Sequence, residues 1–565
     1  MRYWKALAFC QHKLCLHQWR NVSLDEFSSA LECTRRNTQL VIKRLVKEEV
    51  LDWRSGVGRG NLPSARLLKN VAERVERQAN RLIENGQIEH ALSLIGDDEK
   101  DRFLSDYLSQ YQSTPQTKDV LKIPFYRATH DLDPIGINRR TEHHIANYLY
   151  STLLKADDSS AGFSGDLAHA WRLEEHALSI TLRKGLKFHD GTPLYAQDVH
   201  NHFQRLMASP YISKALYQFI DEIEVDGLYK IKFVSHSMPM LLPKLLAHGA
   251  MGITKQVGDT IFGCGPFVLS EQNEWRTLLT VNTTYHGHRP WIDGIEIWNM
   301  GDKAKDFELN SHVVHGSHLR PAQKAQFTSC QQWERGCVHA MLNPLRHPWM
   351  KEYTHRAALQ DLLLSMGKPT GDQCEEVARA TGMVSEPNAI PKADLFHIAS
   401  ALERLPKPTP RLTIMTYQLG THIETAKLAV TSLTQLGIDC ILEVLEYPEF
   451  NHIDTLSRAD IIITGEVFSE DTEMSWLGWL LCTNSNEACL SPENKTWLLT
   501  EIVKVMHRAD NKRRLDEFDK LEKQLIAKGI YQPLFHVKQD LNISNHISAP
   551  ELLANGWIDF SNITM

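Results

Sequence analysis

The chain has 565 residues, of which 42% are hydrophobic and 23% are charged, and its formal net charge is −7. A chain of this length exceeds a single hydrophobic core, so we expect about two to four domains. It contains no run of about 18 apolar residues, so we expect neither a membrane-spanning helix nor a membrane partner. The ten cysteines are scattered without a CxxC pair, which favours reduced thiols in a cytoplasmic protein over a disulfide framework.

The N-terminal part is basic, whereas the rest of the chain is acidic. Residues 1–81 carry 16 Lys and Arg against 8 Asp and Glu, although the whole chain has a net charge of −7. This distribution points to a polyanion partner for the N-terminal part alone. In the opening MRYWKALAFC, Lys5 interrupts a short apolar run and Phe9 stands where a cleavage site needs a small residue. We therefore expect a first amphipathic helix and no signal peptide.

The segment 23–48 has the pattern of a helix-turn-helix. Ser23 is a predicted N-cap, and Glu26 is its capping-box partner three residues on. A second helix is predicted from about residue 35, with Val41 and Leu45 facing inward and Thr38 as a further candidate for that face. Its opposite stripe is polar and basic, and it consists of Arg36, Gln39, Lys43 and Lys47. Such a helix can lie in a major groove, where Arg reads guanine, Gln reads adenine and Lys holds phosphate.

A strand, a glycine-rich turn and a return strand are predicted over residues 50–62, as in the wing of a winged helix. Arg54 and Arg59 are placed there to reach backbone phosphate or the minor groove. A solvated basic face is the alternative for the helix alone, and GVGRGN lacks the Lys-Ser/Thr that a phosphate loop requires. We expect an α+β winged helix that binds double-stranded DNA. The predicted DNA contacts are Arg35, Arg36, Asn37, Thr38, Gln39, Lys43, Arg54 and Arg59.

Residues 65–112 have helical spacing and form a predicted connector. Two interpretations remain open for it: packing onto the winged helix, or a signal-carrying or dimerising helix. The polar, proline-containing stretch 113–117 is the predicted domain boundary.

The stretch 178–203 is the most specific in the chain. Leu178, Ile180 and Leu182 alternate with polar residues as in a half-buried strand, and Asp190-Gly191 predicts a tight turn before a helix. Within it, LRKGLKFHDGTPLYAQDV resembles the signature of the family 5 extracellular solute-binding proteins. The resemblance implies a two-lobed α/β clamshell of the type II periplasmic-binding-protein-like class, with a ligand cleft between the lobes.

The N-terminal segment carries a second resemblance. TRRNTQLVIKRLVKEEVLDWRSGVGRGN is similar to the N-terminal domain of SgrR-type transcriptional regulators, which join a winged helix to a family 5 solute-binding domain in one cytoplasmic chain. The implied division is 1–64 for the winged helix, 65–112 for the connector and 113–565 for the clamshell, with lobe I at about 120–300 and 530–565, lobe II at about 301–529, and a hinge near 298–301.

The resemblance also bears on the ligand. Peptide binders of family 5 hold the peptide amine with an Asp-x-x-Asp-Pro phrase, whereas the corresponding region 465–472 keeps acids but lacks Asp-Pro. SgrR-type regulators imply a metabolite tied to sugar-phosphate stress, so the expected effector is a sugar phosphate, a sugar or a short peptide. Trp476 and Trp479 suit either sugar stacking or core packing. The predicted ligand-binding residues are Tyr126, Arg139, Glu466, Asp471 and Trp476.

No catalytic constellation is evident in the sequence. The phrase 162–165 lacks the spacing of a nucleophile elbow, and the histidines at 312, 315 and 318 have no clear fourth metal ligand. We therefore expect no enzyme, no cofactor and no metal. The resemblance implies an activator, whereas the residues themselves leave the sign of regulation and the formation of a homodimer open. The alternative is a periplasmic substrate-binding subunit of an oligopeptide ABC importer, which would start its first strand within about 40 residues of a cleaved leader.

Overall fold

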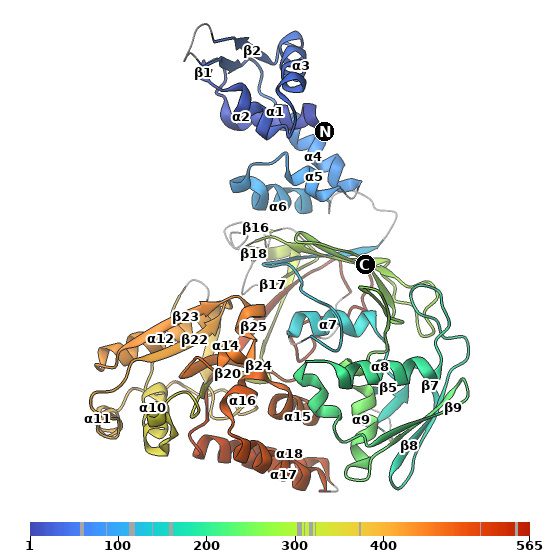
Figure 1. The fold of residues 1–565 in the computed structure, drawn as a ribbon, viewed down its shortest axis with the longest axis vertical. Helices are drawn as coiled ribbons and strands as arrows, with labels where there is room; N and C mark the ends of the chain where they lie inside the picture. The colour runs from blue at the N-terminus through green and yellow to red at the C-terminus, as the bar shows by residue number, and fades with distance from the viewer. Residues whose placement is uncertain are drawn as a thin grey trace.

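The computed structural model describes residues 1–565 except 57–61, 86, 112–118, 138, 158–161, 302–307, 310, 316–319, 322–323, 372–373, 509 and 549–551. The predicted DNA contact Arg59 and the predicted boundary at 113–117 lie outside the described residues. A small N-terminal domain stands at one end of the molecule, helices α4 to α6 follow, and two larger lobes lie side by side below them (Figure 1). Among the described residues, no helix is both long and apolar enough to span a bilayer.

The N-terminal domain is a winged helix, as its pattern predicts. Its elements are α1 (Arg2–Lys13), β1 (Arg20–Asn21), α2 (Leu24–Ala30), α3 (Arg35–Lys47), β2 (Leu51–Arg54) and β3 (Ser64–Leu67), with the strands in the order β1-β3-β2. The predicted capping box is present, because the Ser23 hydroxyl accepts from the Glu26 amide at 3.0 Å and Glu26 accepts from the Ser23 amide at 2.8 Å. In α3 the inward positions belong to Ile42 and Leu45, whereas Val41 is only half-buried.

The connector consists of three helices, α4 (Ala72–Glu84), α5 (Ile88–Leu92) and α6 (Lys100–Tyr111). The apolar faces of α4 and α5 belong to the same hydrophobic cluster as the core of the winged helix. The same cluster continues through Tyr107 of α6 to Trp298 and Met300 of the clamshell. One continuous apolar core therefore joins the winged helix to the solute-binding part of the chain.

Lobe I is built on two four-stranded sheets. The first has the order β13 (Phe267–Gln272), β14 (Arg276–Val281), β15 (Gly294–Asn299) and β4 (Val120–Phe125), and the second has the order β7 (Ala168–Leu173), β8 (Ala177–Leu182), β10 (Lys230–Val234) and β9 (Glu222–Asp226). The predicted alternation in β8 is confirmed, because Leu178, Ile180 and Leu182 are buried. The main helices are α7 (Arg140–Leu149), α8 (Ala196–Ala208) and α9 (Leu242–Ala247).

Lobe II is built on an eight-stranded mixed sheet. Its main path is β17 (Val313–His315), β25 (Tyr531–Ser544), β20 (Gly336–Leu342), β24 (Ile461–Val467), β22 (Leu412–Tyr417) and β23 (Cys440–Leu445), and β19 (Phe327–Trp333) and β21 (Glu376–Arg379) also pair with β25. The main helices are α10 (Tyr353–Leu364), α11 (Leu395–Glu403), α12 (Gly420–Gln435), α15 (Thr472–Cys482), α17 (Pro492–Met506) and α18 (Asn511–Ala527).

Two of the contacts between the lobes involve packed secondary-structure elements. The 14-residue strand β25 pairs with β20 in its first half and with β19 and β17 in its second half, and β17 lies against β4 of lobe I. The expected assignment of residues 530–565 to lobe I is therefore corrected for β25, because its hydrogen bonds place it in the sheet of lobe II. Helix α15 of lobe II packs on the short helix η2 (Ile212–Tyr217) of lobe I, and a single hydrophobic cluster spans both lobes at this contact. The lobes are therefore closed on each other.

Candidate functional site

The outward face of α3 is the first candidate site. Arg36, Gln39 and Lys43 are exposed on it, as the polar stripe predicts, and Lys47 continues it at the end of the helix. The buried residues of α3 are Thr38, Ile42 and Leu45 on the opposite side. Because the core holds this second side, the basic side is free to contact a partner.

The charges on this helix divide into paired and unpaired groups. Arg35 forms a two-point ion pair with Asp25, and Arg44 pairs with Glu48 at 2.9 Å. In contrast, Arg36, Lys43 and Lys47 have no ion pair or hydrogen bond with any residue that the structure describes. Three unpaired cations on one helix face form a site of positive potential that suits phosphate.

Two of the predicted DNA contacts, Thr38 and Arg54, lie in different surroundings. The prediction for Thr38 is corrected, because this side chain is fully buried and its hydroxyl lies 3.2 Å from the Thr34 carbonyl and 3.0 Å from the Ser28 hydroxyl. Arg54 is exposed at the end of β2, and its guanidinium stacks 3.8 Å above the ring of Trp19. Trp19 was not predicted, since an aromatic residue between two helical segments carries no distinguishing spacing.

The second candidate site lies between the lobes, around Arg139. This residue is the N-cap of α7, it is only 9% exposed, and its guanidinium lies 4.5 Å above the Tyr447 ring of lobe II. Its Nη1 atom is buried and has no hydrogen-bond partner among the described residues. A buried guanidinium nitrogen without a hydrogen-bond partner is costly, and a ligand anion would supply that partner.

The charges of the two neighbouring arginines are balanced by direct pairing with carboxylates, whereas Arg139 has no such pair. Arg127 forms two hydrogen bonds with Glu142, at 2.7 and 3.1 Å, and Arg140 pairs with Glu334 at 2.5 Å. Burial alone would raise the pKa of Glu142, but the Arg127 hydrogen bonds and the charges of Arg127 and Arg139 lower it. Two guanidinium groups thus share one carboxylate, which leaves one positive charge uncompensated at this position.

Lobe II contributes aromatic and polar groups to the same site. The Tyr417 ring lies 5.2 Å from the Tyr447 ring and 4.9 Å from the His422 ring. Burial lowers the pKa of His422 to about 3, so the imidazole is neutral, and neither ring nitrogen has a hydrogen-bond partner among the described residues. Burial raises the pKa of Glu466 to about 7. The predicted residue Tyr126 lies on the lobe I side, where its hydroxyl accepts from Arg127 Nε at 3.4 Å.

Two predicted ligand residues have other roles. Asp471 caps α15 by accepting from the Met474 amide at 3.1 Å, and it pairs with Lys244 of lobe I at 2.9 Å. Trp476 is fully buried and stacks on Phe518 at 5.9 Å between ring centroids, so the core interpretation holds and the ligand prediction is corrected. Trp476 lies in α15 and Asp471 is its N-cap, and this helix packs against the sheet of lobe II.

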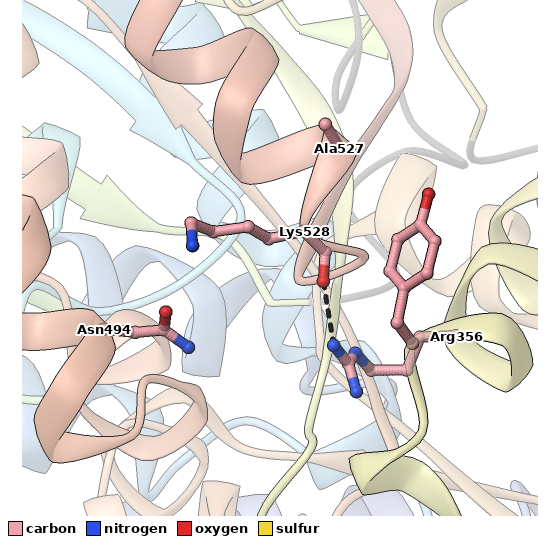
Figure 2. Close-up of a pocket in the computed structure, with 5 residues that line it drawn as sticks. Arg356, Asn494, Ala527 and Lys528 are labelled. Carbon is pink, nitrogen blue, oxygen red and sulfur yellow. Dashed lines mark hydrogen bonds between the residues drawn. The ribbon is translucent and has the colours of Figure 1, made fainter.

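A polar cluster in lobe II stabilises the fold and is not a ligand-site candidate. A cavity of about 330 Å³ is lined by Tyr353, Arg356, Asn494, Ala527 and Lys528. Figure 2 shows the Arg356 side chain beside Lys528 in this cavity. The Arg356 guanidinium donates there to the carbonyls of Met350, Lys351, Lys528 and Gly529, so its donors are engaged in holding α10 to α18.

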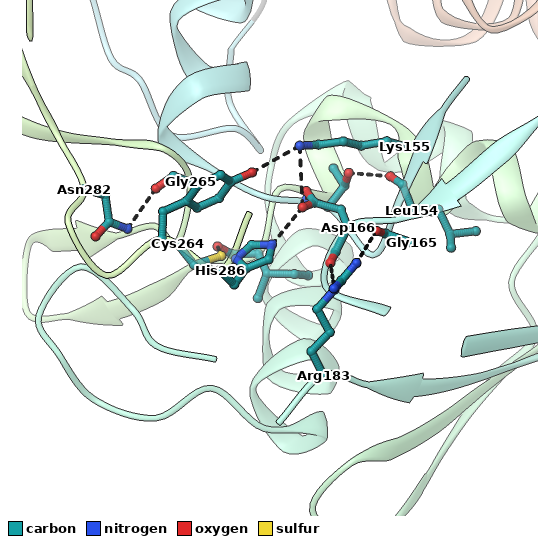
Figure 3. Close-up of polar contacts among 12 residues, drawn as sticks. Leu154, Lys155, Gly165, Asp166, Arg183, Cys264, Gly265, Asn282 and His286 are labelled. Atoms are coloured by element: carbon teal, nitrogen blue, oxygen red, sulfur yellow. Dashed lines mark hydrogen bonds and ion pairs between the residues drawn. The ribbon is translucent and has the colours of Figure 1, made fainter. Parts of the chain in front are cut away.

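In lobe I, buried Asp166 contacts His286 at 2.8 Å and Lys155 at 3.5 Å, and Arg183 donates to the Asp166 carbonyl (Figure 3). These contacts join the strand pair of residues 154–165 to the loop that holds His286. The described part of the chain holds no group of three or more His, Cys, Asp or Glu residues in a metal-binding arrangement.

The fold defines a two-lobed clamshell with a winged helix at its N-terminus. Residues 162–360 match the bacterial extracellular solute-binding proteins, family 5 (middle region), and residues 5–117 match the N-terminal domain of the sugar transport-related sRNA regulators. The chain thus combines an SgrR-type N-terminal domain with a family 5 solute-binding domain.

Two relatives match this chain over nearly its whole length. The chain is 23% identical over 565 residues to the HTH-type transcriptional regulator SgrR of Yersinia pestis (strain Pestoides F), covering 96% of this chain and 95% of that one. It is 24% identical over 574 residues to the uncharacterized protein YhjP of Bacillus subtilis, covering 97% of this chain and 96% of the relative.

Solved structures confirm the fold of the clamshell. The oligopeptide-binding protein AppA of Bacillus subtilis, in complex with a nonapeptide, has a TM-score of 0.63 at 15% identity and covers 80% of this chain and 99% of its own. NikA of Brucella suis, in complex with Fe(III)-EDTA, has a TM-score of 0.59 at 16% identity and covers 79% of this chain and 99% of its own. Since these two proteins hold unrelated ligands, the fold leaves the ligand of this chain open.

Proposed function

We propose that this protein is a DNA-binding transcriptional regulator whose activity responds to a small polar anion held between its two lobes. The observation that carries the DNA-binding part is the outward face of α3, where Arg36, Lys43 and Lys47 have no partner among the described residues while Arg35 and Arg44 are paired. The full-length relatives named as HTH-type transcriptional regulators support it. The importer-subunit alternative has less support, because the N-terminal domain matches a regulator family.

The ligand chemistry follows from Arg139. The buried guanidinium of Arg139 shares the carboxylate of Glu142 with Arg127 and therefore favours an anion, and Tyr447 and Tyr417 provide flat faces for an apolar or sugar ring. The carboxylate of Asp471 is paired with Lys244 and is therefore not available to a peptide amine. A sugar phosphate therefore fits this site better than an uncharged sugar or a peptide amine.

Helix α6 is the proposed route between the two sites. Tyr107 packs against Trp298 with ring centroids 5.9 Å apart, and the Lys100 ammonium lies 5.5 Å from the Trp275 ring. Trp298 is the last residue but one of β15, next to the chain segment that leaves lobe I. A ligand with different affinities for open and closed lobes would change the position of this segment, and α6 would transmit the change to the winged helix.

The other parts of the proposal follow from the same argument. The protein acts in the cytoplasm, where DNA is accessible, and it is a binding protein rather than an enzyme. A homodimer is an additional hypothesis, since two winged helices would read two half-sites.

DNA binding is tested with the full-length protein by gel shift and by the salt dependence of affinity. We expect the R36A/K43A double variant to lose most of its DNA affinity. The slope of log affinity against log salt concentration should become shallower by about 2, because two phosphate contacts are removed. The matched control is R77A, which removes an exposed arginine of α4 that lies 4.0 Å from Glu73. Equal affinity of R36A/K43A and the wild type would refute DNA binding through α3.

Ligand binding is tested by thermal shift of the full-length protein against sugar phosphates, sugars and short peptides. We expect a sugar phosphate to raise the Tm of the wild type and of R172Q, an exposed control in β7, but not of R139Q. A shift of equal size in R139Q would exclude Arg139 from the ligand site.

A further inference from the structure

The outward face of α3 contains one apolar residue, Leu40. It is 60% exposed, and it is absent from the hydrophobic cluster of the N-terminal domain, to which α3 contributes Ile42, Leu45 and the half-buried Val41. A single exposed leucine is ordinary on a protein surface. The position of Leu40 relative to the unpaired cations is what distinguishes it.

Leu40 lies at the centre of the unpaired basic stripe. Residues 36, 40, 43 and 47 are spaced by four, three and four positions, so they form one row along the helix. This row lies opposite the buried row of Thr38, Ile42 and Leu45. A partner that contacts Leu40 therefore also meets the unpaired positive charges around it, and it must be anionic.

We infer that Leu40 is a specificity-determining residue that contacts the C5 methyl group of a thymine in the major groove. The major groove of DNA is the surface that combines a row of phosphates with isolated apolar groups, because each A·T pair presents there the thymine methyl group among polar base edges. The cations beside Leu40 fix the helix on the backbone, and Leu40 selects A·T over G·C at one position. This inference rests on the proposed DNA-binding function.

The experiment begins with selection of binding sites from a random double-stranded DNA library by the full-length protein. Each thymine of the selected site is then replaced by deoxyuridine, which removes only the methyl group, and affinities are measured by fluorescence anisotropy. We expect one such replacement to weaken wild-type binding about four-fold, the effect of one buried methyl group. The L40A variant should bind the thymine and deoxyuridine sites equally at that position.

The matched control is V46A. Val46 is also exposed on α3, at 40%, but it lies about 120° around the helix axis from Leu40. V46A should keep the full deoxyuridine effect. Insensitivity of the wild type to every deoxyuridine replacement, or an unchanged effect in L40A, would overturn the role of Leu40 and leave DNA binding intact.

Two further outcomes are decisive. Conversion of a dimer to a monomer by L40A in size-exclusion chromatography would overturn the inference, because Leu40 would then be a protein contact. If the wild type selects no sequence and shows no salt-dependent DNA binding, the proposed function itself fails, and this outcome is distinct from loss of the methyl effect alone.

Discussion

The Lys244 ammonium lies 2.9 Å from a carboxylate oxygen of Asp471, and this ion pair joins α9 of lobe I to the N-terminus of α15 of lobe II. The two side chains are 18% and 27% exposed, and Lys244 also lies 3.9 Å from Glu473. The two lobes are therefore connected by a charge pair that belongs to the protein itself.

This pair should contribute to the stability of the closed form. We expect K244M and D471N each to lower the free energy of unfolding by about 1–2 kcal/mol, because each leaves a partly buried charge without its partner. In urea unfolding, the double variant should lose less free energy of unfolding than the two single variants lose together, with a coupling energy of about 1 kcal/mol. A coupling energy near zero would show that the contact does not hold the lobes together.

A second prediction concerns the buried carboxylate of Glu522 in α18. Burial raises its pKa from 4.5 to about 7, and the carboxyl accepts from the Met383 amide at 2.6 Å. Between these two pKa values the folded state binds the proton more tightly than the unfolded state. The stability that the neutral form contributes is therefore complete below pH 4.5 and is lost as the pH rises through 7.

The E522Q variant isolates this effect, because it keeps the acceptor for the Met383 amide and cannot ionise. We expect E522Q to be more stable than the wild type by about 1–3 kcal/mol at pH 8, with little difference at pH 4.5. Urea unfolding at the two pH values measures it. The control is D516N, at an exposed position of the same helix, for which we expect no such gain in stability at pH 8. A constant difference between E522Q and the wild type at both pH values would contradict the prediction.

A third prediction concerns the ligand-free protein. The uncompensated Arg139 guanidinium costs stability until a ligand pairs with it. R139Q should therefore unfold at a Tm equal to or above that of the ligand-free wild type, although it loses the ligand-induced shift. A marked fall in the Tm of R139Q without ligand would show that Arg139 has a structural role.

A fourth prediction tests the contact between α6 and the clamshell. The Y107L variant keeps an apolar residue at the Tyr107 position but removes the ring that packs on Trp298. We expect the sugar phosphate that raises the wild-type Tm to raise that of Y107L equally. The change in DNA affinity that the sugar phosphate causes, measured by anisotropy, should be much smaller in Y107L than in the wild type.

The control for this coupling is R102A, an exposed residue of α6 whose side chain is 75% exposed. R102A should keep the wild-type effect of ligand on DNA affinity. If Y107L also keeps it, the signal passes by another route, and α6 serves only to pack the winged helix onto the clamshell.

Local features of this protein could be predicted from the sequence. The Ser23–Glu26 capping box, the alternation of Leu178, Ile180 and Leu182, and the basic stripe of α3 all depend on residues within a few positions of one another. Helix caps and periodic burial are determined by the same short-range geometry in any fold. The order of the winged helix and the clamshell also follows from the chain itself, because each part carries its own motif.

The candidate sites depended on contacts that no local pattern contains. Thr38 and Trp476 are buried because helices from other parts of their domains cover them. Asp471 is neutralised by Lys244, which is 227 residues away, and Arg139 is left uncompensated because Arg127 takes the carboxylate of Glu142. The sequence alone determined which charges and apolar faces each segment carries. The tertiary structure decided which of those charges are paired, because pairing depends on distances between segments that only folding brings together.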